Sequence, residues 1–171
     1  MSPLGLGNDI GGSLRNPAHC CGIASIKPST GVVPMATMVP PEDLTLSAQQ
    51  MLAEGPLARH VSDLRAALVT IAGPHLRDAR SLPVTLTDLV PGERLRIALV
   101  DDPPGGTTHP GVAAAVRAAA DLLADAGHEI VSATPPDYEA VIDHWADLLR
   151  ADIGVNRALL ESSAAEHAAR M

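Results

Sequence analysis

Ser13 is the residue best placed for chemistry, because it follows two consecutive glycines in the segment Asn-Asp-Ile-Gly-Gly-Ser-Leu-Arg. Glycine has no Cβ, so the backbone N–H groups of such a segment can turn towards one bound oxygen atom. If the Ser13 hydroxyl attacked a carbonyl carbon, these groups would stabilise the negative charge that develops on the carbonyl oxygen. The nearest donors are the backbone N–H groups of Ile10, Gly11, Gly12 and Ser13 itself.

Several common glycine-rich motifs do not fit this segment. A dinucleotide-binding fingerprint starting at Gly5 would need its third glycine where Ile10 stands. A phosphate-binding loop would need a Gly-Lys-Ser or Gly-Lys-Thr run, and none follows. The serine elbow of the α/β hydrolases would need glycine in place of Arg15. The remaining alternative to a catalytic serine is a plain glycine-rich turn before a short helix.

The whole stretch resembles the amidase signature family of serine hydrolases. The resemblance rests on Gly-Asn-Asp-Ile-Gly-Gly-Ser-Leu-Arg-Asn-Pro-Ala, on Cys21-Gly22, and on Lys-Pro-Ser-Thr-Gly at 27–31. A second block, Glu-Gly-Pro-Leu-Ala-Arg at 54–59 followed by Val-Ser-Asp-Leu at 61–64, is similar to the next segment of that family. Leu-Arg-Ile-Ala at 95–98 resembles a third, so the likeness extends over about residues 3 to 155.

This resemblance implies an amidase that hydrolyses a carboxamide C–N bond through an acyl-enzyme on Ser13. In the family, a second serine and a neutral lysine activate the nucleophile, and both lie upstream of the segment that Ser13 occupies. Ser2 is too close to Ser13 to be that second serine, and Lys27 is the only lysine of the chain and belongs to the Lys-Pro-Ser-Thr-Gly segment. We expect Arg15 to pair with Asp9 and hold the loop.

Residues 1–171 are therefore expected to be a partial amidase domain, truncated at both ends and inactive alone, because a serine hydroxyl is a weak nucleophile without a base. The alternative is a non-catalytic remnant or interaction module of amidase ancestry. The expected partner is a small-molecule amide whose identity the sequence does not give. No cofactor is expected. No metal site is expected either, because His19, Cys20 and Cys21 are neighbours in sequence and no further ligand pair completes a tetrahedral set.

The composition narrows the classes of protein to which the chain could belong. The net charge of −8 disfavours nucleic acid, whose phosphates bind clustered lysine and arginine. No apolar run approaches the roughly 20 residues of a membrane span. The adjacent cysteines cannot form an ordinary loop-closing disulfide and are typical of a reduced, cytoplasmic protein. Because a sheet without its neighbouring strands exposes unpaired edges, we expect self-association through those edges.

The predicted fold class is α/β, a mixed sheet flanked by helices. Strands are expected at 4–8, 23–27, 95–100 and 128–132, and helices at 17–22, 61–72, 110–126 and 138–153. Asn16 is the expected N-cap of the first helix, and Gly22 and Gly154 are expected helix ends. The 32–42 segment is expected to be a loop, 44–51 has no clear pattern, and the alanine-rich 155–171 tail is compatible with a helix. The strand–helix–strand unit at 95–132 predicts two parallel strands.

Overall fold

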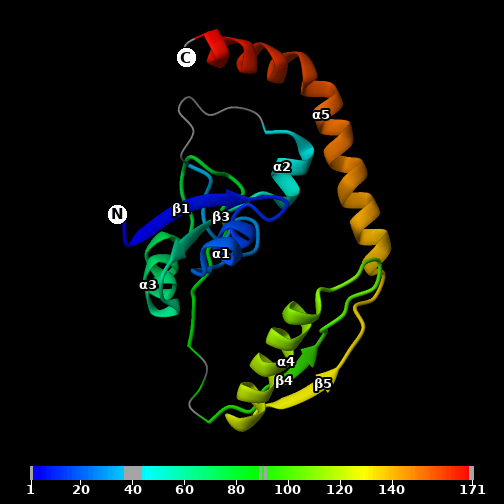
Figure 1. Cartoon of the computed structure of the whole chain (residues 1–171). Coiled ribbons are helices and arrows are strands. Elements are labelled where there is room, and N and C mark those ends of the chain that lie inside the picture. The colour runs from blue at the N-terminus through cyan, green and yellow to red at the C-terminus, as the bar shows by residue number, and fades with distance from the viewer. Residues whose placement is uncertain (1, 37–43, 89, 91, 170–171) are drawn as a thin grey trace. The chain divides into compact units, whose positions relative to one another are not determined.

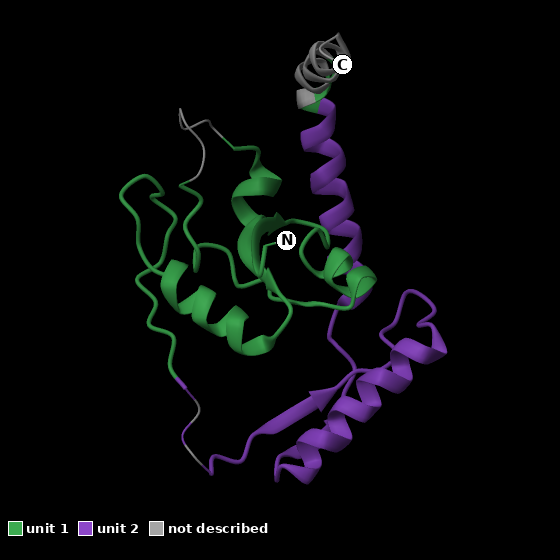
Figure 2. Ribbon diagram, turned by 60° about the vertical axis from the view of Figure 1, so that its left-hand side comes forward, with its two compact units in different colours: residues 1–87, 155–171 green, residues 88–154 purple. Residues whose placement is uncertain are grey.

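The computed structural model describes residues 2–36, 44–88, 90 and 92–169, so part of the loop expected at 32–42 lies outside the described residues. The chain divides into two compact units (Figure 2). Unit 1 contains residues 1–87 and 155–171, and unit 2 contains residues 88–154. Both combine strands with helices, which confirms the α/β class.

Unit 1 is built on an antiparallel sheet with the strand order β1-β3-β2 (Figure 1). Strand β1 spans Leu4–Asp9, β3 spans Ala53–Ala58 and β2 is the two-residue strand Ala24–Ser25. Every residue of β1 is paired, from Leu4 opposite Ala58 to Asp9 opposite Ala53. The predicted strand at 23–27 is therefore shorter than expected. Strand β3 was not predicted, because its Glu-Gly-Pro core has low strand propensity and tertiary pairing overrides it.

A leucine wedge joins this sheet to the first helix. Leu14 is fully buried and its side chain points at two facing glycines, Gly7 in β1 and Gly55 in β3. A Cβ atom placed on Gly55 would lie 2.8 Å from Cδ1 of Leu14, and one on Gly7 would lie 3.4 Å from Cδ2. The paired glycines thus make room for the residue that follows Ser13. The rest of the unit 1 core is made of small and aliphatic residues: Ala18, Val33, Ala53, Ala58, Leu64 and Ala67.

Helix α1 spans Arg15–Cys21 and starts one residue before its predicted cap. Leu14 is the N-cap and makes no side-chain cap hydrogen bond, so the prediction of Asn16 as the cap was wrong. The physical reason is that the carboxylate of Asp9 accepts the N–H groups of Leu14 and Arg15, which replaces a local cap. Gly22 ends the helix as predicted, with a left-handed φ of 63°.

Helices α2 and α3 complete unit 1. Helix α2 spans Leu46–Met51 and was not predicted from its mixed sequence; Thr45 caps it by accepting the Ala48 N–H at 3.4 Å. Helix α3 spans Val61–Ile71, as its apolar spacing predicts, and packs on β3 and β2.

The start of α3 is poorly capped. His60 is the N-cap in an extended conformation and makes no side-chain cap hydrogen bond. Serine is among the preferred N-cap residues because its hydroxyl accepts an N–H of the first turn. We expect His60→Ser to raise the free energy of unfolding of unit 1 by about 1 kcal/mol in urea titrations. His60→Ala is the matched control and should bring no gain; an equal gain from both variants would contradict the capping explanation.

Unit 2 contains the predicted parallel strand–helix–strand unit. Strand β4 spans Arg96–Leu99, α4 spans Pro110–Asp125 and β5 spans Glu129–Ser132. The two strands pair in parallel, from Arg96 opposite Glu129 to Leu99 opposite Ser132, which confirms the prediction.

Helix α5 runs from Tyr138 to Ala169, so the helix end predicted at Gly154 was wrong. A single glycine inside a helix costs only about 1 kcal/mol relative to alanine, and the helix-favouring tail that follows offsets this. Among the described residues, no helix has both the length and the apolar character needed to cross a lipid bilayer.

Candidate active site

Ser13 lies in the turn between the end of β1 and the start of α1. The turn comprises residues 10–14, and Gly12 adopts a φ of +124° that side-chain-bearing residues rarely reach. The carbonyl oxygen of Gly12 accepts the N–H of Asn16 at 2.7 Å, which ties the turn to the first residues of the helix. Ser13 is exposed, and its hydroxyl makes no hydrogen bond to a described residue. The nucleophile candidate is therefore presented to solvent by a backbone that is fixed on both sides.

The side chain of Asp9 stabilises this turn. Its fully buried carboxylate accepts the backbone N–H groups of Gly12 at 2.6 Å, Leu14 at 3.1 Å and Arg15 at 3.4 Å. The guanidinium of Arg15 adds two further bonds, from Nε and Nη2, each at 2.9 Å. The Arg15 side chain is 57% exposed, so only one partner of this pair is buried. One carboxylate thus accepts the N–H groups of Gly12 and Leu14 in the turn and that of Arg15 at the start of α1.

The electrostatics follow from this geometry. The Arg15 hydrogen bonds, with help from the N–H groups of Gly12 and Leu14, hold the pKa of Asp9 well below its usual range, although burial opposes this. Asp9 in turn raises the pKa of Arg15. The lowered pKa favours the ionised form of the Asp9 carboxylate, whose negative charge is balanced by Arg15.

The four backbone donors proposed for an oxyanion hole do not have equal freedom. The N–H of Gly12 is committed to Asp9, and Ile10 takes part in a further interaction of its own. The N–H groups of Gly11 and Ser13 make no hydrogen bond to any described part of the chain, and both residues are exposed. Two of the four N–H groups, those of Gly11 and Ser13, are thus not engaged by a described residue.

Lys27 lies close enough to the Asp9–Arg15 ion pair for both charges to affect its pKa. Burial lowers the pKa of Lys27, and the charges of Asp9 and Arg15 act on it in opposite directions. Its Nζ donates to the carbonyl oxygen of Met51 at 2.9 Å, at the end of α2 and just before β3. Lys27 therefore ties the segment after β2 to the start of β3, whose first residue pairs with Asp9.

Sequence reasoning missed Leu14 and Glu54. The signal for Leu14 was the pair of glycines, one in each strand, that leave its space. Glu54 lies opposite Asn8 in the sheet and is half-buried; burial raises the pKa of its carboxyl group. Among the described residues, His19, Cys20 and Cys21 are not joined by further ligands into a group that could hold a metal ion.

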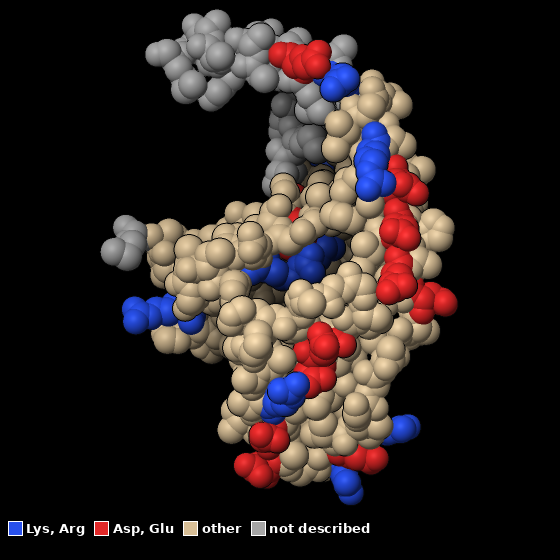
Figure 3. Space-filling view, turned by 45° about the vertical axis from the view of Figure 1, so that its right-hand side comes forward, with Lys and Arg blue, Asp and Glu red and all other residues tan. Residues whose placement is uncertain are grey.

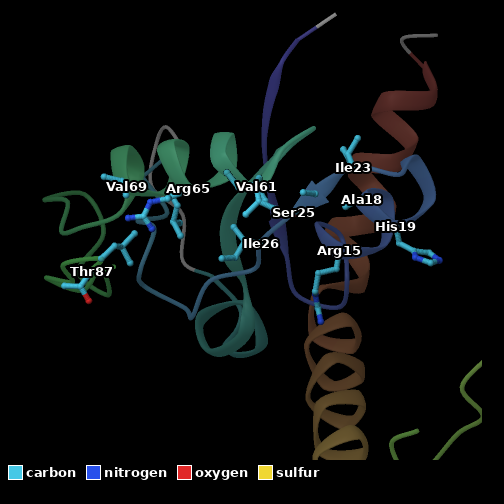
Figure 4. Close-up of a pocket in the computed structure, with 14 residues that line it drawn as sticks. Arg15, Ala18, His19, Ile23, Ser25, Ile26, Val61, Arg65, Val69 and Thr87 are labelled. Carbon is cyan, nitrogen blue, oxygen red and sulfur yellow. The ribbon is translucent and has the colours of Figure 1, made fainter. Parts of the chain in front are cut away.

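One hollow of unit 1 that is lined mainly by apolar residues does not include Ser13. It has a volume of about 630 Å³ and lies between α1, β2 and α3 (Figure 4). Figure 4 shows side chains of α3, such as Val61 and Arg65, on one side and those of α1, such as Ala18 and His19, on the other. Ser13 does not line it, so this hollow is not the place where a reacting carbonyl would sit.

Comparison with known proteins places this arrangement in a family. The sequence pattern of the family described as Amidase matches residues 1–169. The indoleacetamide hydrolase of Bradyrhizobium diazoefficiens is 41% identical over 143 residues, which are 84% of this chain and 27% of that protein.

Two solved structures agree. The structure of 6-aminohexanoate cyclic dimer hydrolase with substrate is 31% identical, with a TM-score of 0.64 over 78% of this chain and 29% of that one. A bacterial aryl acylamidase of the amidase signature family is 25% identical, with a TM-score of 0.72 over 94% of this chain and 34% of that one. The chain thus spans about a third or less of the length of these relatives. It belongs to the amidase signature family of hydrolases, which act on C–N bonds.

Proposed function

We propose that Ser13 is the nucleophile of an amidase that cleaves a carboxamide through an acyl-enzyme. The observation that carries the proposal is the exposed Ser13 hydroxyl beside the unengaged N–H groups of Gly11 and Ser13. These two donors are the proposed core of the oxyanion hole, with Ile10 and Gly12 completing the loop that shapes it. Asp9 and Arg15 are proposed positioning residues, since their ion pair and the bonds of Asp9 to the backbone hold the loop.

The proposed reaction has two steps. Ser13 Oγ bonds to the amide carbonyl carbon as a base takes the hydroxyl proton, and the C–N bond then breaks as the amine leaves with that proton. Water next attacks the ester carbonyl, which releases the carboxylic acid and returns the proton to Ser13 Oγ. In both steps the carbonyl oxygen carries the negative charge, and the backbone donors stabilise it.

In this proposal, the chain does not itself supply the base that takes the proton of the Ser13 hydroxyl. Lys27 is its only lysine, and Nζ of Lys27 is engaged with the Met51 carbonyl oxygen. We therefore propose that the second serine and the lysine come from polypeptide outside these residues and that the chain alone is inactive. The competing proposal, a non-catalytic module, is favoured by the same missing base.

A chimera separates these two proposals. The chain would replace the matching 143 residues of the Bradyrhizobium diazoefficiens indoleacetamide hydrolase, so that the host supplies everything else. We expect the chimera to hydrolyse indoleacetamide and to react at Ser13 with a fluorophosphonate probe, whereas the chain alone stays unlabelled. Ser13→Ala should abolish both signals, because no other hydroxyl lies in this loop.

Ser29→Ala is the matched control, since Ser29 is exposed and its hydroxyl makes no hydrogen bond to a described residue; it should leave both signals unchanged. A folded chimera without activity would support the non-catalytic module. Labelling of the chain alone at Ser13 would overturn the claim that it is inactive by itself.

The proposed substrate is a small-molecule amide. On the face shown in Figure 3, acidic side chains gather along α5 and basic ones are scattered, which does not suit a phosphate backbone. We propose a cytoplasmic location, on the ground that Cys20 and Cys21 are both free thiols.

We also expect the isolated chain to self-associate through its open sheet edge. Among the described residues, β1 pairs with β3 on one side only, and Leu6 on β1 is 65% exposed. Size-exclusion chromatography with light scattering should show dimers or larger species that increase with concentration. A monomer at every concentration, melting in one cooperative transition, would contradict this expectation.

A further inference from the structure

The last two residues of α1 carry the two thiols of the chain, one directly after the other. Cys20 and Cys21 are both free and exposed. Sγ of Cys20 lies 4.0 Å from Oδ1 of Asn16, one turn earlier in the helix. A thiol is a weak hydrogen-bond donor, so this contact does not hold the sulfur in place. Two sulfur nucleophiles on adjacent residues can therefore act together on one atom.

A direct bond between the two sulfurs fits the backbone poorly. The Cα atoms of adjacent residues are about 3.8 Å apart across a trans peptide bond, whereas disulfides usually join Cα atoms that are about 4.4–6.8 Å apart. An atom inserted between the sulfurs relieves this constraint, because two bonds span a longer distance than one. The pair is therefore better suited to a bridging atom than to a disulfide.

The two thiols form a set of two protein ligands. Thiolates prefer soft centres. A structural zinc ion takes four ligands, and among the described residues no group of three histidine, cysteine or acidic side chains could hold a metal ion. His19 lines the hollow between α1, β2 and α3 (Figure 4), whereas Cys21 lines a second hollow. This donor set matches a soft centre that accepts two sulfurs and brings its own third bond.

The second hollow supplies an apolar wall beside Cys21. It has a volume of about 870 Å³ and is bordered by the start of β1, the end of α1, the end of β3 and the start of α3. Its apolar side chains include those of Leu4, Ile23 and Leu57. An aromatic ring attached to the bridging atom could cover this apolar surface and remove it from water.

We propose that Cys20 and Cys21 form a binding site for arylarsonous acids, which are trivalent arsenicals whose arsenic already has one bond to an aromatic carbon. Each thiol displaces one hydroxyl group: an S–As bond forms as an As–O bond breaks, and the thiol proton leaves with the hydroxyl group as water. One arsenical thus gains two S–As bonds and releases two water molecules, and no atom changes its oxidation state. The site does not depend on the chemistry of Ser13.

Bridging must change the end of α1. Neighbouring positions of a helix point about 100° apart, so their side chains do not face each other. The last turn is closed by the N–H of Ile23, which donates to the carbonyl oxygen of Ala18 at 3.0 Å. Gly22 is already left-handed next to Cys21, whereas Asp9 holds the other end of the helix. We therefore expect the arsenical to open the last turn and to leave the first one intact.

Thiol counting with phenylarsonous acid, formed when phenylarsine oxide dissolves in water, tests the proposal on the reduced full chain under argon. Because the chain has two cysteines, the count reports this pair alone. We expect one equivalent to remove both thiols, and the denatured product to have the mass of one chain plus one arsenical minus two water molecules. Loss of one thiol per equivalent, or a product with the mass of two chains, would overturn the proposal.

Single-thiol variants measure the gain from the second bond, by competition with 2,3-dimercaptopropanol. We expect Cys20→Ser and Cys21→Ser each to bind phenylarsonous acid at least about 100-fold more weakly, because the second bond forms at a high effective concentration. His19→Ala is the matched control at the same helix end and should bind as the unmutated chain does. Tight binding by either single-thiol variant, or equal weakening in the control, would contradict a site of two thiols. If a variant does not fold, the thiol count of the unmutated chain still decides.

The aromatic group has a test of its own. Relative to 2,3-dimercaptopropanol as the reference dithiol, the chain should favour phenylarsonous over methylarsonous acid at least about tenfold, because the ring covers apolar surface beside Cys21. Leu4→Ser should reduce this preference, and Leu46→Ser, at an exposed leucine that does not line this hollow, should leave it unchanged. Equal relative binding of the two acids by the unmutated chain would overturn the choice of an aryl arsenical.

Amide hydrogen exchange locates the structural change. Bound phenylarsonous acid should speed the exchange of the Ile23 N–H at least about tenfold and leave that of Leu14, which Asp9 holds, unchanged. Equal acceleration at both positions would mean general unfolding and would contradict a local site. Ser13→Ala should bind the arsenical as tightly as the unmutated chain, so this proposal and that of the nucleophile can fail separately.

Discussion

Replacing Asp9 by alanine is expected to lower the free energy of unfolding of unit 1 by about 3 kcal/mol, because the variant leaves the N–H of buried Leu14 and that of Gly12 without partners and removes the counter-ion of Arg15. Urea titration followed by amide exchange in unit 1 measures the loss. The expected loss is at the low end of the range for a broken ion pair, because the Arg15 side chain is largely exposed.

Arg15→Met is the comparison that separates the two contributions. It removes the ion pair and leaves the backbone donors on Asp9, so we expect a loss of only about 1 kcal/mol. Equal losses in both variants would mean that the ion pair alone stabilises the turn, which would contradict the role given to the backbone bonds.

Because of the same carboxylate, we expect the free energy of unfolding to fall at acid pH. The pKa of Asp9 is lower in the folded chain than its unfolded value of about 3.9, so its contribution is fully present above that pH and is lost as the pH falls below it. Asp78 acts in the same direction: burial would raise its pKa, but the N–H groups of Met35 and Arg80 and the charge of Arg80 lower it on balance. In the Asp9→Asn variant the free energy of unfolding should therefore fall less steeply at acid pH. The part of the fall that is due to Asp78 should remain.

Gly55→Ala is the second change with a large expected effect. The new Cβ would overlap the carbonyl oxygen of Ile26 and lie 2.8 Å from Cδ1 of Leu14. A backbone carbonyl cannot rotate out of the way, so we expect a loss of about 3 kcal/mol or more and a disturbed Ser13 turn. Thermal and urea unfolding measure the loss.

Gly5→Ala in the neighbouring strand is the matched control. Its Cβ would meet Leu57 at 3.9 Å, an ordinary contact, so the change should stay within about 0.5 kcal/mol. Similar losses for the two variants would show that strand glycines matter for some reason other than the space occupied by Leu14.

The elements with a regular spacing of apolar residues, and those that end at a glycine, were predictable from the sequence. Helix α3 and the parallel unit of β4, α4 and β5 follow from apolar spacing, and Gly22 ends α1 because glycine readily adopts the left-handed conformation. Strand β3 was not predictable in this way, because Glu54, Gly55 and Pro56 have poor strand propensity and are extended only through pairing with β1. The start of α1 depended likewise on a carboxylate five residues before Leu14, which local cap rules do not consider.

For the candidate site, the sequence located Ser13 and the surrounding backbone donors but could not show which of them are free. That distinction depends on where the two oxygens of Asp9 point, which is a property of the folded turn. It leaves the N–H groups of Gly11 and Ser13 as the expected contacts of a reacting oxygen, whereas that of Gly12 stays with Asp9.

A crystal structure of the chimera with a trifluoromethyl ketone analogue of its amide substrate tests the role of Ser13 most directly. We predict a covalent bond to Ser13 Oγ, with the adduct oxygen about 2.7–3.1 Å from the backbone nitrogens of Gly11 and Ser13. An adduct on another residue, or one whose oxygen points away from both nitrogens, would contradict it.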